Sequence, residues 1–452
     1  MEWDKLLNTK RLGNREAKAE IGRSPFNSDH DKIIFSGAFR RLAKKTQVHP
    51  LATNDHVHNR LTHSLEVACV GRSLGIKVGQ ALADNKRLPT GFLPTDLGDI
   101  VQSACLAHDI GNPPFGHTGE EAIRNWFKYD GKDYLSSLKP EEQNDFLLFE
   151  GNAQGLRILT SSEYHPYDGG MRLTYATLAA FIKYPWTSQP TFEGKRPKHN
   201  KYGVFQSELK VFEEIALAVG LDKREDDNSH WYCRHPLVYL MEAADDFCYG
   251  IIDLEDGLEM GILEWNEVYE LLEPALDKSK IDYINSELDK VCERGKPALI
   301  RGEIISAYID AAVTAFIKHE EEIFQGKNDD LISLCPPHIK DSVQNSKQLA
   351  KDKIFSHPRK IEIEIGSYHV ISTLLDIMCA AVNEWTVNSK TMSYRSQRVI
   401  KLIGEDTFYP NTENNPEMKY LAMMRVIDFI SGMTDHYATY LAKQFNGMGQ
   451  SR

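Results

Sequence analysis

The sequence has few cysteines, and no two of them are closely spaced. Its 452 residues include 7 cysteines, and none forms the C-x-x-C pair of zinc knuckles. The wide spacing also argues against a disulfide framework. We therefore expect reduced thiols in the protein core. The cysteines are Cys69, Cys105, Cys233, Cys248, Cys292, Cys335 and Cys379.

A long uncharged apolar run is also missing. The first residues, MEWDK, lack the basic and then apolar pattern of a signal peptide. The best candidate for a membrane span, residues 368–385, is interrupted by Asp376. These absences predict a cytoplasmic protein that does not enter a membrane.

The chain has no excess of positive charge and no P-loop. It carries 53 basic and 65 acidic residues, a formal net charge of −12, which disfavours general coating of nucleic acid. An anionic substrate would need a local cluster of lysine and arginine. Every Gly-Lys pair is followed by a residue other than serine or threonine, so P-loop cleavage at a γ-phosphate is not expected.

Apolar residues recur at helical spacing through most of the chain. Such stretches cover 62–84, 96–109 after Thr95 as N-cap, a helix opened by Pro236, 301–319, 368–385 and 416–445. Alternating isoleucines at 360–365 instead predict a strand. The fold class predicted is all-α, a helical bundle with a minor β-hairpin.

Polar segments divide these helical stretches. Residues 128–144 and 185–202 are interpreted as surface loops. A boundary near 260–265 would separate a motif-bearing core, 1–265, from a helical C-terminal region, 266–452, which is expected to complete the site and to supply oligomer contacts.

Four residues form a candidate metal site: His63, His108, Asp109 and Asp245. Imidazole and carboxylate ligands suit Mn²⁺, Fe²⁺ or Zn²⁺, and Mg²⁺ less comfortably. Asp109 follows an apolar helix, where an unpaired carboxylate would be costly. A satisfied structural network is the alternative. A second His-Asp pair, at His30, lies in a polar segment and is interpreted as exposed.

A loop directly after the candidate ligands carries a second feature. In IGNPPFGHTGE, residues 110–120, prolines and glycines favour an irregular turn that returns His117 and Glu120 towards the metal. A histidine poised by a carboxylate can transfer protons near neutral pH. The alternative is that both residues merely cap the next helix. Separately, Asp245, Tyr249 and Asp253 form a polar stripe along one helix.

Together these features resemble the HD-domain superfamily and, within it, the deoxyguanosinetriphosphate triphosphohydrolase family. The resemblance spans nearly the whole chain. The segments that carry it are FRRLAKKTQV (39–48), RLTHSLEV (60–67), LAHDIGNPPFGHTGEEA (106–122), FEGNAQGLRIL (149–159), EAADDFCYGIIDLEDG (242–257) and ISGMTDHYATYL (430–441).

The resemblance implies roles for individual residues. His63, His108, Asp109 and Asp245 match metal ligands, and His117 and Glu120 match a catalytic pair beside the α-phosphate. The residues matched to substrate contacts are Tyr249 and Asp253 at the sugar, Gln47 near the sugar and base, and Arg60, Lys183 and Tyr184 at the phosphates. Tyr394, Arg395 and Arg398 could add phosphate contacts or form a solvated helix face.

The implied reaction is metal-dependent hydrolysis of a deoxynucleoside triphosphate, with dGTP and water giving deoxyguanosine and triphosphate. One divalent cation per site is implied, Mg²⁺ or Mn²⁺ first, with Co²⁺, Fe²⁺, Ni²⁺ or Zn²⁺ as alternatives. The family also implies a homo-oligomer, with a hexamer favoured, and single-stranded DNA or a dNTP as an effector. The alternative functions are an HD phosphohydrolase for another nucleotide and an HD protein that senses nucleotides or binds single-stranded DNA.

Overall fold

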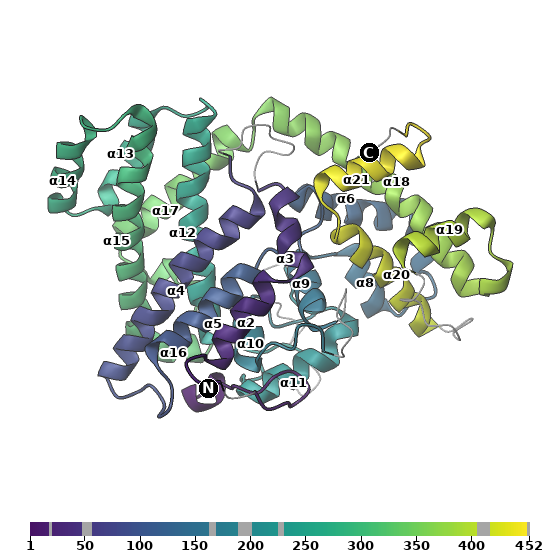
Figure 1. The fold of residues 1–452 in the computed structure, drawn as a ribbon, viewed down its shortest axis with the longest axis horizontal. Helices are drawn as coiled ribbons and strands as arrows, with labels where there is room; N and C mark the ends of the chain where they lie inside the picture. Colours follow the sequence, from purple (N-terminus) through teal and green to yellow (C-terminus); the bar gives the residue numbers. More distant parts are fainter. Residues whose placement is uncertain are drawn as a thin grey trace.

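The computed structural model describes residues 1–17, 20–47, 57–161, 169–188, 201–224, 230–404 and 416–449, and within them it is built of helices (Figure 1). In chain order these are α1 (Trp3–Leu6), α2 (Pro25–Ile34), α3 (Gly37–Arg41), α4 (Arg60–Asp84), α5 (Pro94–Ala107), α6 (Gly116–Tyr129), α7 (Lys132–Leu135), α8 (Pro140–Leu147), α9 (Gly151–Thr160), α10 (Tyr175–Phe181), α11 (Leu209–Val219), α12 (Pro236–Glu259), α13 (Trp265–Leu272), α14 (Lys278–Leu288), α15 (Lys296–Lys318), α16 (Glu320–Phe324), α17 (Pro337–Leu349), α18 (Pro358–Asn388), α19 (Tyr394–Ile403), α20 (Pro416–Ser431) and α21 (Asp435–Phe445).

The all-α prediction is confirmed, but the predicted hairpin is wrong. Only isolated β-bridges, such as Trp186 with Trp231, occur among the described residues. Residues 360–365 belong to α18, which begins at Pro358. Proline at the first helical position favours a helix start, and the long apolar helix that follows continues the same backbone. Two isoleucines of the alternating pattern, Ile361 and Ile365, are exposed instead of buried.

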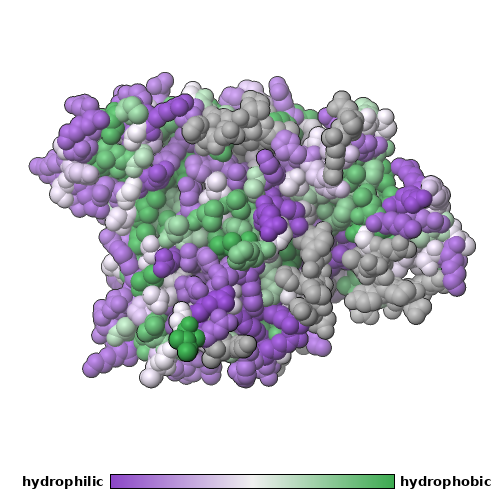
Figure 2. All heavy atoms as spheres, viewed as in Figure 1, coloured by the Kyte–Doolittle hydropathy of each residue, from purple (hydrophilic) through white to green (hydrophobic). Residues whose placement is uncertain are grey.

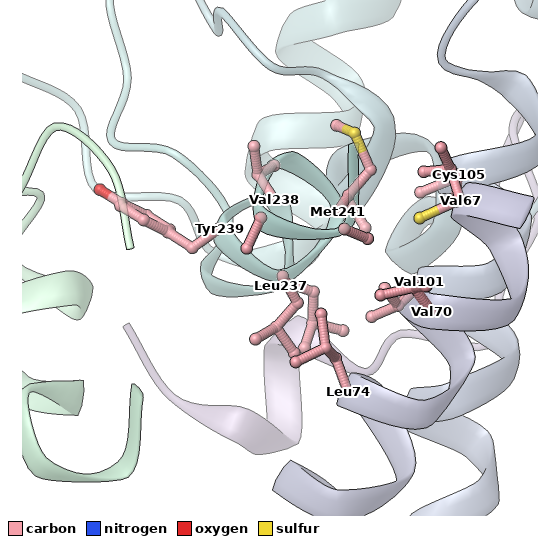
Figure 3. Packing of buried hydrophobic residues seen from close by; sticks show 14 of the residues in the cluster. Val67, Val70, Leu74, Val101, Cys105, Leu237, Val238, Tyr239 and Met241 are labelled. Atoms are coloured by element: carbon pink, nitrogen blue, oxygen red, sulfur yellow. The ribbon is translucent and has the colours of Figure 1, made fainter. Parts of the chain in front are cut away.

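A first hydrophobic core lies between α4, α5 and α12, with α15 and α17 packed around them. Figure 3 shows its centre, where Leu74 of α4 lies near Leu237 of α12, and Val67 of α4 lies beside Cys105 of α5. These side chains are fully buried. The core therefore fixes the relative positions of the three helices that carry the candidate metal ligands.

Small residues allow α4 and α5 to pack closely along their length. Gly71, Gly75 and Gly79 are spaced four residues apart on α4, so they share one face. A Cβ atom added at Gly75 would lie 2.6 Å from the carbonyl oxygen of Leu97, and one at Gly79 would lie 2.7 Å from Cα of Pro94. Any larger side chain on this face would push the two helices apart.

A second hydrophobic core involves α6 and the C-terminal helices. Helix α18 packs against α6, α19, α20 and α21, on the right of the molecule in Figure 1. Residues Lys360–Thr391, most of which belong to α18, form the one helical stretch among the described residues that is long and apolar enough to cross a membrane. Half of the apolar 18-residue segment within this stretch is buried inside the protein. A helix of a protein core can pass the same test of length and composition.

Several predicted boundaries differ in the structure. The N-cap of α5 is Leu93, not Thr95, because Pro94 takes the first helical position and Asp96 accepts the backbone N–H of Leu93. The segment 128–144, predicted as a loop, contains α7, the last residues of α6 and the first turn of α8. In the other predicted loop, residues 189–200 lie outside the described residues, and the described remainder is not helical.

All seven cysteines are free, as predicted. Five of them are buried, but Cys69 and Cys292 are exposed, so the expectation of core thiols is wrong for these two. Cys69 lies on α4, and Cys292 lies in the turn between α14 and α15.

The surface is mainly hydrophilic, with local hydrophobic areas. Figure 2 shows hydrophobic side chains gathered left of centre on the visible face, over the region of α4 and α12. Elsewhere exposed apolar side chains are scattered, as on most folded proteins. A distinct row of them, Ile361, Ile365 and Tyr368, lies on the N-terminal part of α18.

Candidate active site and metal centre

Four predicted ligands lie together where α4, α5 and α12 meet. Potential ligand atoms of His63, His108 and Asp109 lie within 4.8 Å of one another. The Asp245 carboxylate completes the group, with its Oδ1 atom 3.1 Å from Nε2 of His63 and 3.5 Å from Nε2 of His108. The two imidazole rings are 5.4 Å apart and inclined at 63°.

Local structure explains how these side chains reach one point. Asn59 caps α4 with its side chain and places His63 in the first turns of that helix. Helix α5 ends at Ala107, so His108 and Asp109 lie at its C-terminal end. The Nδ1 atom of His108 donates to the carbonyl of Cys105 at 2.6 Å, which leaves Nε2 facing the cluster. Metal-binding histidines commonly donate their other ring nitrogen in this way.

Asp109 shows that the cluster fits a cation. It is only 7% exposed, its Oδ1 atom lies 2.8 Å from Arg60 and accepts from Asn112, and its Oδ2 atom is buried with no hydrogen-bond partner among the described residues. Burial alone would raise the pKa of Asp109, but the Arg60 guanidinium and both histidines lower it to about 2. A buried ionised oxygen without a partner is costly, and a divalent cation would satisfy it.

The same balance holds at Asp245. Burial opposes ionisation there, but His108 and His63 hold the pKa of this carboxyl well below its usual range. A mixed set of imidazole nitrogens and ionised carboxylates is a ligand set for Mn²⁺, Fe²⁺, Zn²⁺ or Mg²⁺.

His117 and Glu120 form a hydrogen-bonded pair at the start of α6. Nδ1 of His117 donates to Oε2 of Glu120 at 2.8 Å. Glu120 is buried, and its Oε1 atom accepts the backbone N–H of Gly151 at 2.8 Å. Burial raises the pKa of Glu120, but the contact with His117 outweighs burial and lowers it. Because 73% of the His117 side chain is exposed, the ring can meet a substrate while an anchored carboxylate orients it.

The turn before α6 requires unusual backbone. Phe115 has φ +64° and Gly116 has φ +58°, both in the left-handed region. A Cβ atom at Gly116 would also lie 2.6 Å from Nη2 of Arg60. Glycine at 116 therefore lets the buried Arg60 side chain pass beneath the turn and reach Asp109. This arginine links the metal cluster to the loop that carries His117.

A cavity of about 280 Å³ joins the metal cluster to the acid–base pair. Seven predicted residues line it: Gln47, Arg60, His63, Asp109, His117, Asp245 and Tyr249. The side-chain oxygen of Gln47 is buried and has no hydrogen-bond partner among the described residues, so it is free to bind a ligand.

Three other predicted residues, Lys183, Tyr184 and Asp253, are not among those that line the described cavity. Lys183 pairs with Glu242 at 3.3 Å, and Arg234 pairs with the same carboxylate at 2.6 Å. Burial lowers the pKa of Lys183, but Glu242 outweighs burial and raises it, so the lysine stays charged. Tyr184 is buried beside Lys183. Asp253 is 1% exposed, and burial raises its pKa to about 8.

The C-terminal half contributes to the cavity through residues that the sequence analysis did not single out. Phe355, Lys360, Ile363 and Glu364 line the cavity. The Phe355 ring lies 5.7 Å from that of Tyr249, and Nζ of Lys360 lies 4.2 Å from the centre of the Phe355 ring. Helical spacing could have revealed this face, because residues 360, 363 and 364 share one side of a helix but not of a strand.

Two further interpretations concern residues outside the cavity. Tyr394, Arg395 and Arg398 lie exposed on α19, where Arg398 donates to the hydroxyl of Tyr394, and none of them lines the described cavity. His30, interpreted as a surface residue, is partly buried and contacts Asp31, away from the metal cluster. Thr46, Asn112, Phe115 and Thr118 also line the cavity without having been predicted.

Comparisons with known proteins agree with this geometry. The HD domain family matches residues 60–176. A Pseudomonas aeruginosa (strain LESB58) "deoxyguanosinetriphosphate triphosphohydrolase-like protein" is 49% identical over 450 residues, 99% of each chain. A protein of the same name from Synechocystis is 40% identical over 99% of this chain and 100% of its own. A "deoxyguanosinetriphosphate triphosphohydrolase" from Enterobacter is 31% identical over 91% of this chain and 92% of its own.

Proposed function

The chain belongs to the deoxyguanosinetriphosphate triphosphohydrolase family of HD-domain proteins, and on that premise we propose that it hydrolyses deoxynucleoside triphosphates, with dGTP the leading substrate. The products would be deoxyguanosine and inorganic triphosphate. One observation carries the proposal: His117, anchored by Glu120, faces the same cavity as Asp109 and Asp245.

His63, His108, Asp109 and Asp245 would hold one divalent cation, Mg²⁺ or Mn²⁺ in the first place. When bound, such a cation stabilises negative charge on a phosphate and lowers the pKa of water. Asp109 favours this role because its buried Oδ2 atom has no other partner among the described residues.

His117 would transfer the proton. Water adds to the α-phosphorus and loses a proton to His117, the bond to the 5′-oxygen breaks, and His117 returns a proton to the departing oxygen. Because Nδ1 of His117 donates to Glu120, its Nε2 atom is the ring nitrogen left to face the substrate. A positioned histidine of this kind contributes about 10²- to 10⁴-fold to a rate. Direct attack by His117 on phosphorus is the less favoured alternative.

Charge in the site suits a triphosphate. Arg60 lies in the cavity wall and can pair with a phosphate as well as with Asp109. Lys183 and Tyr184 lie nearby, with Lys183 held charged by Glu242. Arg60 and Lys183 supply local positive charge in a chain whose net charge is −12, and Tyr184 lies beside Lys183.

The polar stripe on α12 would bind the sugar. Tyr249 lines the cavity one turn beyond Asp245, and Asp253 follows one turn later. Asp253 would hold the 3′-hydroxyl, and Gln47 would lie near the sugar and base. If Tyr249 packs against C2′, a ribose hydroxyl loses hydration without gaining a partner, which disfavours ribonucleotides.

The proposal extends to assembly and location. We expect a cytoplasmic homo-oligomer, with a hexamer favoured, in which residues 1–265 form the catalytic core and 266–452 complete the site and supply oligomer contacts. The exposed row Ile361, Ile365 and Tyr368 on α18 supports a contact there. Single-stranded DNA or a dNTP could act as an effector. Light scattering after size-exclusion chromatography, with and without dGTP, measures the oligomeric state.

Product analysis tests the function directly. The protein is incubated with each dNTP and NTP in turn, with Mg²⁺, Mn²⁺ or Co²⁺, and the products are separated by chromatography. The proposal expects deoxynucleoside and triphosphate from dNTPs. Release of a monophosphate and pyrophosphate, or turnover of only monophosphates or cyclic nucleotides, would identify a different HD phosphohydrolase. Binding of nucleotide without any product would identify a sensor.

A further inference from the structure

Asp435, the first residue of α21, touches the catalytic loop from the far end of the chain. It is 1% exposed. Its Oδ1 atom accepts the backbone N–H of Phe115 at 2.9 Å, and its Oδ2 atom accepts the backbone N–H of Thr46 at 2.9 Å and also the Thr46 hydroxyl. One buried carboxylate therefore binds two segments that line the active-site cavity.

The contact with Phe115 falls at a strained point. Phe115 is one residue before α6 and two before His117, and its φ of +64° is unfavourable for a residue with a side chain. Such a conformation persists only where the surroundings hold it. Asp435 accepts the N–H of this residue, while the Phe115 ring is buried in the second core.

The contact with Thr46 orders the opposite wall. Thr46 immediately precedes Gln47, and both line the cavity. The neighbouring Lys45 is buried and donates to the carbonyl of Asn112 and to the carbonyl of Ser431, each at 2.5 Å. The junction of α20 and α21 thus fixes the position of residues 45–47 relative to residues 112–115.

We propose that Asp435 is a positioning residue, which acts through Phe115 and Thr46 to place the His117–Glu120 pair and Gln47 against the metal cluster. This inference rests on the proposed function for its rate effect. Asp435 contacts neither the metal ligands nor the interior of the first core. Its loss should therefore lower the rate of hydrolysis and leave metal binding intact.

Asp428 provides a matched control on the same pair of helices. It is a buried carboxylate of α20, bound by Arg157 and Gln154 of α9 and by Arg425. Those partners anchor α20 without touching the loop at 112–117. Asp428→Asn should weaken the C-terminal helices at least as much as Asp435→Asn does, because it also removes the buried partner of the Arg157 guanidinium.

The experiment compares full-length wild type, Asp435→Asn and Asp428→Asn, each with Mn²⁺ and dGTP. For Asp435→Asn we expect kcat to fall by about 10- to 100-fold, the usual cost of displacing a catalytic group by about 1 Å. Mn²⁺ affinity should match that of wild type, because Asp435 contacts none of the metal ligands, and KM should rise, because Thr46 precedes Gln47 in the cavity wall. Asp428→Asn should lower the melting temperature and leave kcat close to that of wild type.

Hydrogen exchange supplies a readout that does not need turnover. Peptides covering 110–118 and 44–47 should exchange faster in Asp435→Asn than in wild type, and Asp428→Asn should leave them protected. Thr46→Val is a milder variant that keeps the Phe115 contact, and it should give a smaller fall in kcat. It also serves if Asp435→Asn does not fold.

The outcomes separate the two claims. Unchanged kcat in Asp435→Asn, an equal fall in Asp428→Asn, or unchanged exchange of the 110–118 peptide would each overturn the positioning role. If wild type hydrolyses no dNTP, the proposed function fails instead, and the exchange comparison still decides whether Asp435 holds the loop.

Discussion

The two halves of the active site are held in place by different forces. The metal ligands come from α4, α5 and α12, which share the first hydrophobic core and meet through close helix packing. His117 and Glu120 belong to α6, which packs in the second core with α18. Polar contacts position this second half: Gly151 holds Glu120, and Asp435 holds the loop.

The difference teaches that metal binding and proton transfer should be separable. A change in the first half should remove the cation and all activity with it. A change in the second half should spare the cation and reduce only the rate. Arg60 is the exception, because it contacts Asp109 and passes beneath Gly116, so it belongs to both halves.

The largest effect is expected from Asp245→Asn and Asp109→Asn. Each replacement removes an ionised ligand at a site built around buried carboxylates, so hydrolysis of dGTP should fall below detection. The helical fold should remain, because packing in the first core does not depend on the cation. Steady-state assays measure the loss, and circular dichroism checks the fold. Normal turnover in either variant would contradict the four-ligand assignment.

A smaller but still large effect is expected from His117→Ala. The rate should fall by about 10²- to 10⁴-fold, because general acid–base catalysis typically contributes that much. KM should change little, since the mostly exposed His117 ring is proposed to transfer a proton and not to hold the substrate. Burst and steady-state kinetics with dGTP measure kcat separately from KM. A fall of less than tenfold would contradict the proposed role in proton transfer.

Sugar discrimination should change more modestly. Wild type should prefer dNTPs to NTPs and lose activity with 2′,3′-dideoxynucleotides. In Asp253→Ala the ratio of kcat/KM for dGTP to that for ddGTP should fall by about 10-fold, roughly one hydrogen bond to a charged or buried group. A purely structural pair of Tyr249 and Asp253 would instead change stability and leave this ratio untouched. Equal hydrolysis of ddGTP and dGTP by wild type would show that the sugar is placed wrongly.

The smallest effect concerns Asp256 in the first half of the site. Like Asp435, it is a buried carboxylate that accepts a backbone N–H from another segment. Buried Asp256 accepts the ring Nδ1–H of His58 at 2.7 Å and its backbone N–H, just before α4 begins. Burial lowers the pKa of His58, but Asp256 and Glu66 outweigh burial and raise it to about 10. Because the pKa of His58 is higher in the folded than in the unfolded chain, protonation of His58 stabilises the fold. This stabilisation is fully present below the pKa of the unfolded chain, about 6.5, and is lost as pH rises through about 10.

His58→Gln should therefore lower the melting temperature by a few degrees near pH 6.5, and the gap from wild type should close by about pH 10. Thermal melts of both proteins across that range measure the gap. A gap that stays constant with pH would mean that the His58 charge contributes nothing. Asp330→Asn, which changes a partly buried loop carboxylate that accepts the backbone N–H of Ser333, serves as a control without pH dependence in the gap.

The first half of the site was more predictable from sequence than the second. His108 and Asp109 end an apolar helix, and Asp245 lies on another, so helical periodicity alone placed these residues on elements that could meet. The structure brings them together as predicted. Helix packing in this half depends on side-chain spacing that one sequence displays directly, such as the glycines at intervals of four on α4.

The second half depends on contacts that spacing does not reveal. The bond between Phe115 and Asp435 joins residues 320 positions apart, and no local pattern predicts it. The alternating isoleucines led to a strand prediction for residues 360–365, although Pro358 favours a helix start. As a helix, this segment places Lys360 and Glu364 in the cavity wall. The exposure of Ile361 and Ile365 shows that burial on one sheet face was not what spaced them.

The most direct test of separable halves is a Mn²⁺ titration of His108→Ala and His117→Ala side by side, followed by electron paramagnetic resonance. His117→Ala should bind one Mn²⁺ per chain with an affinity close to that of wild type. His108→Ala should lose at least about tenfold in affinity, as expected when a site loses a ligand. Equal loss of Mn²⁺ in both variants would make His117 part of the metal site and contradict the division of the site into two halves.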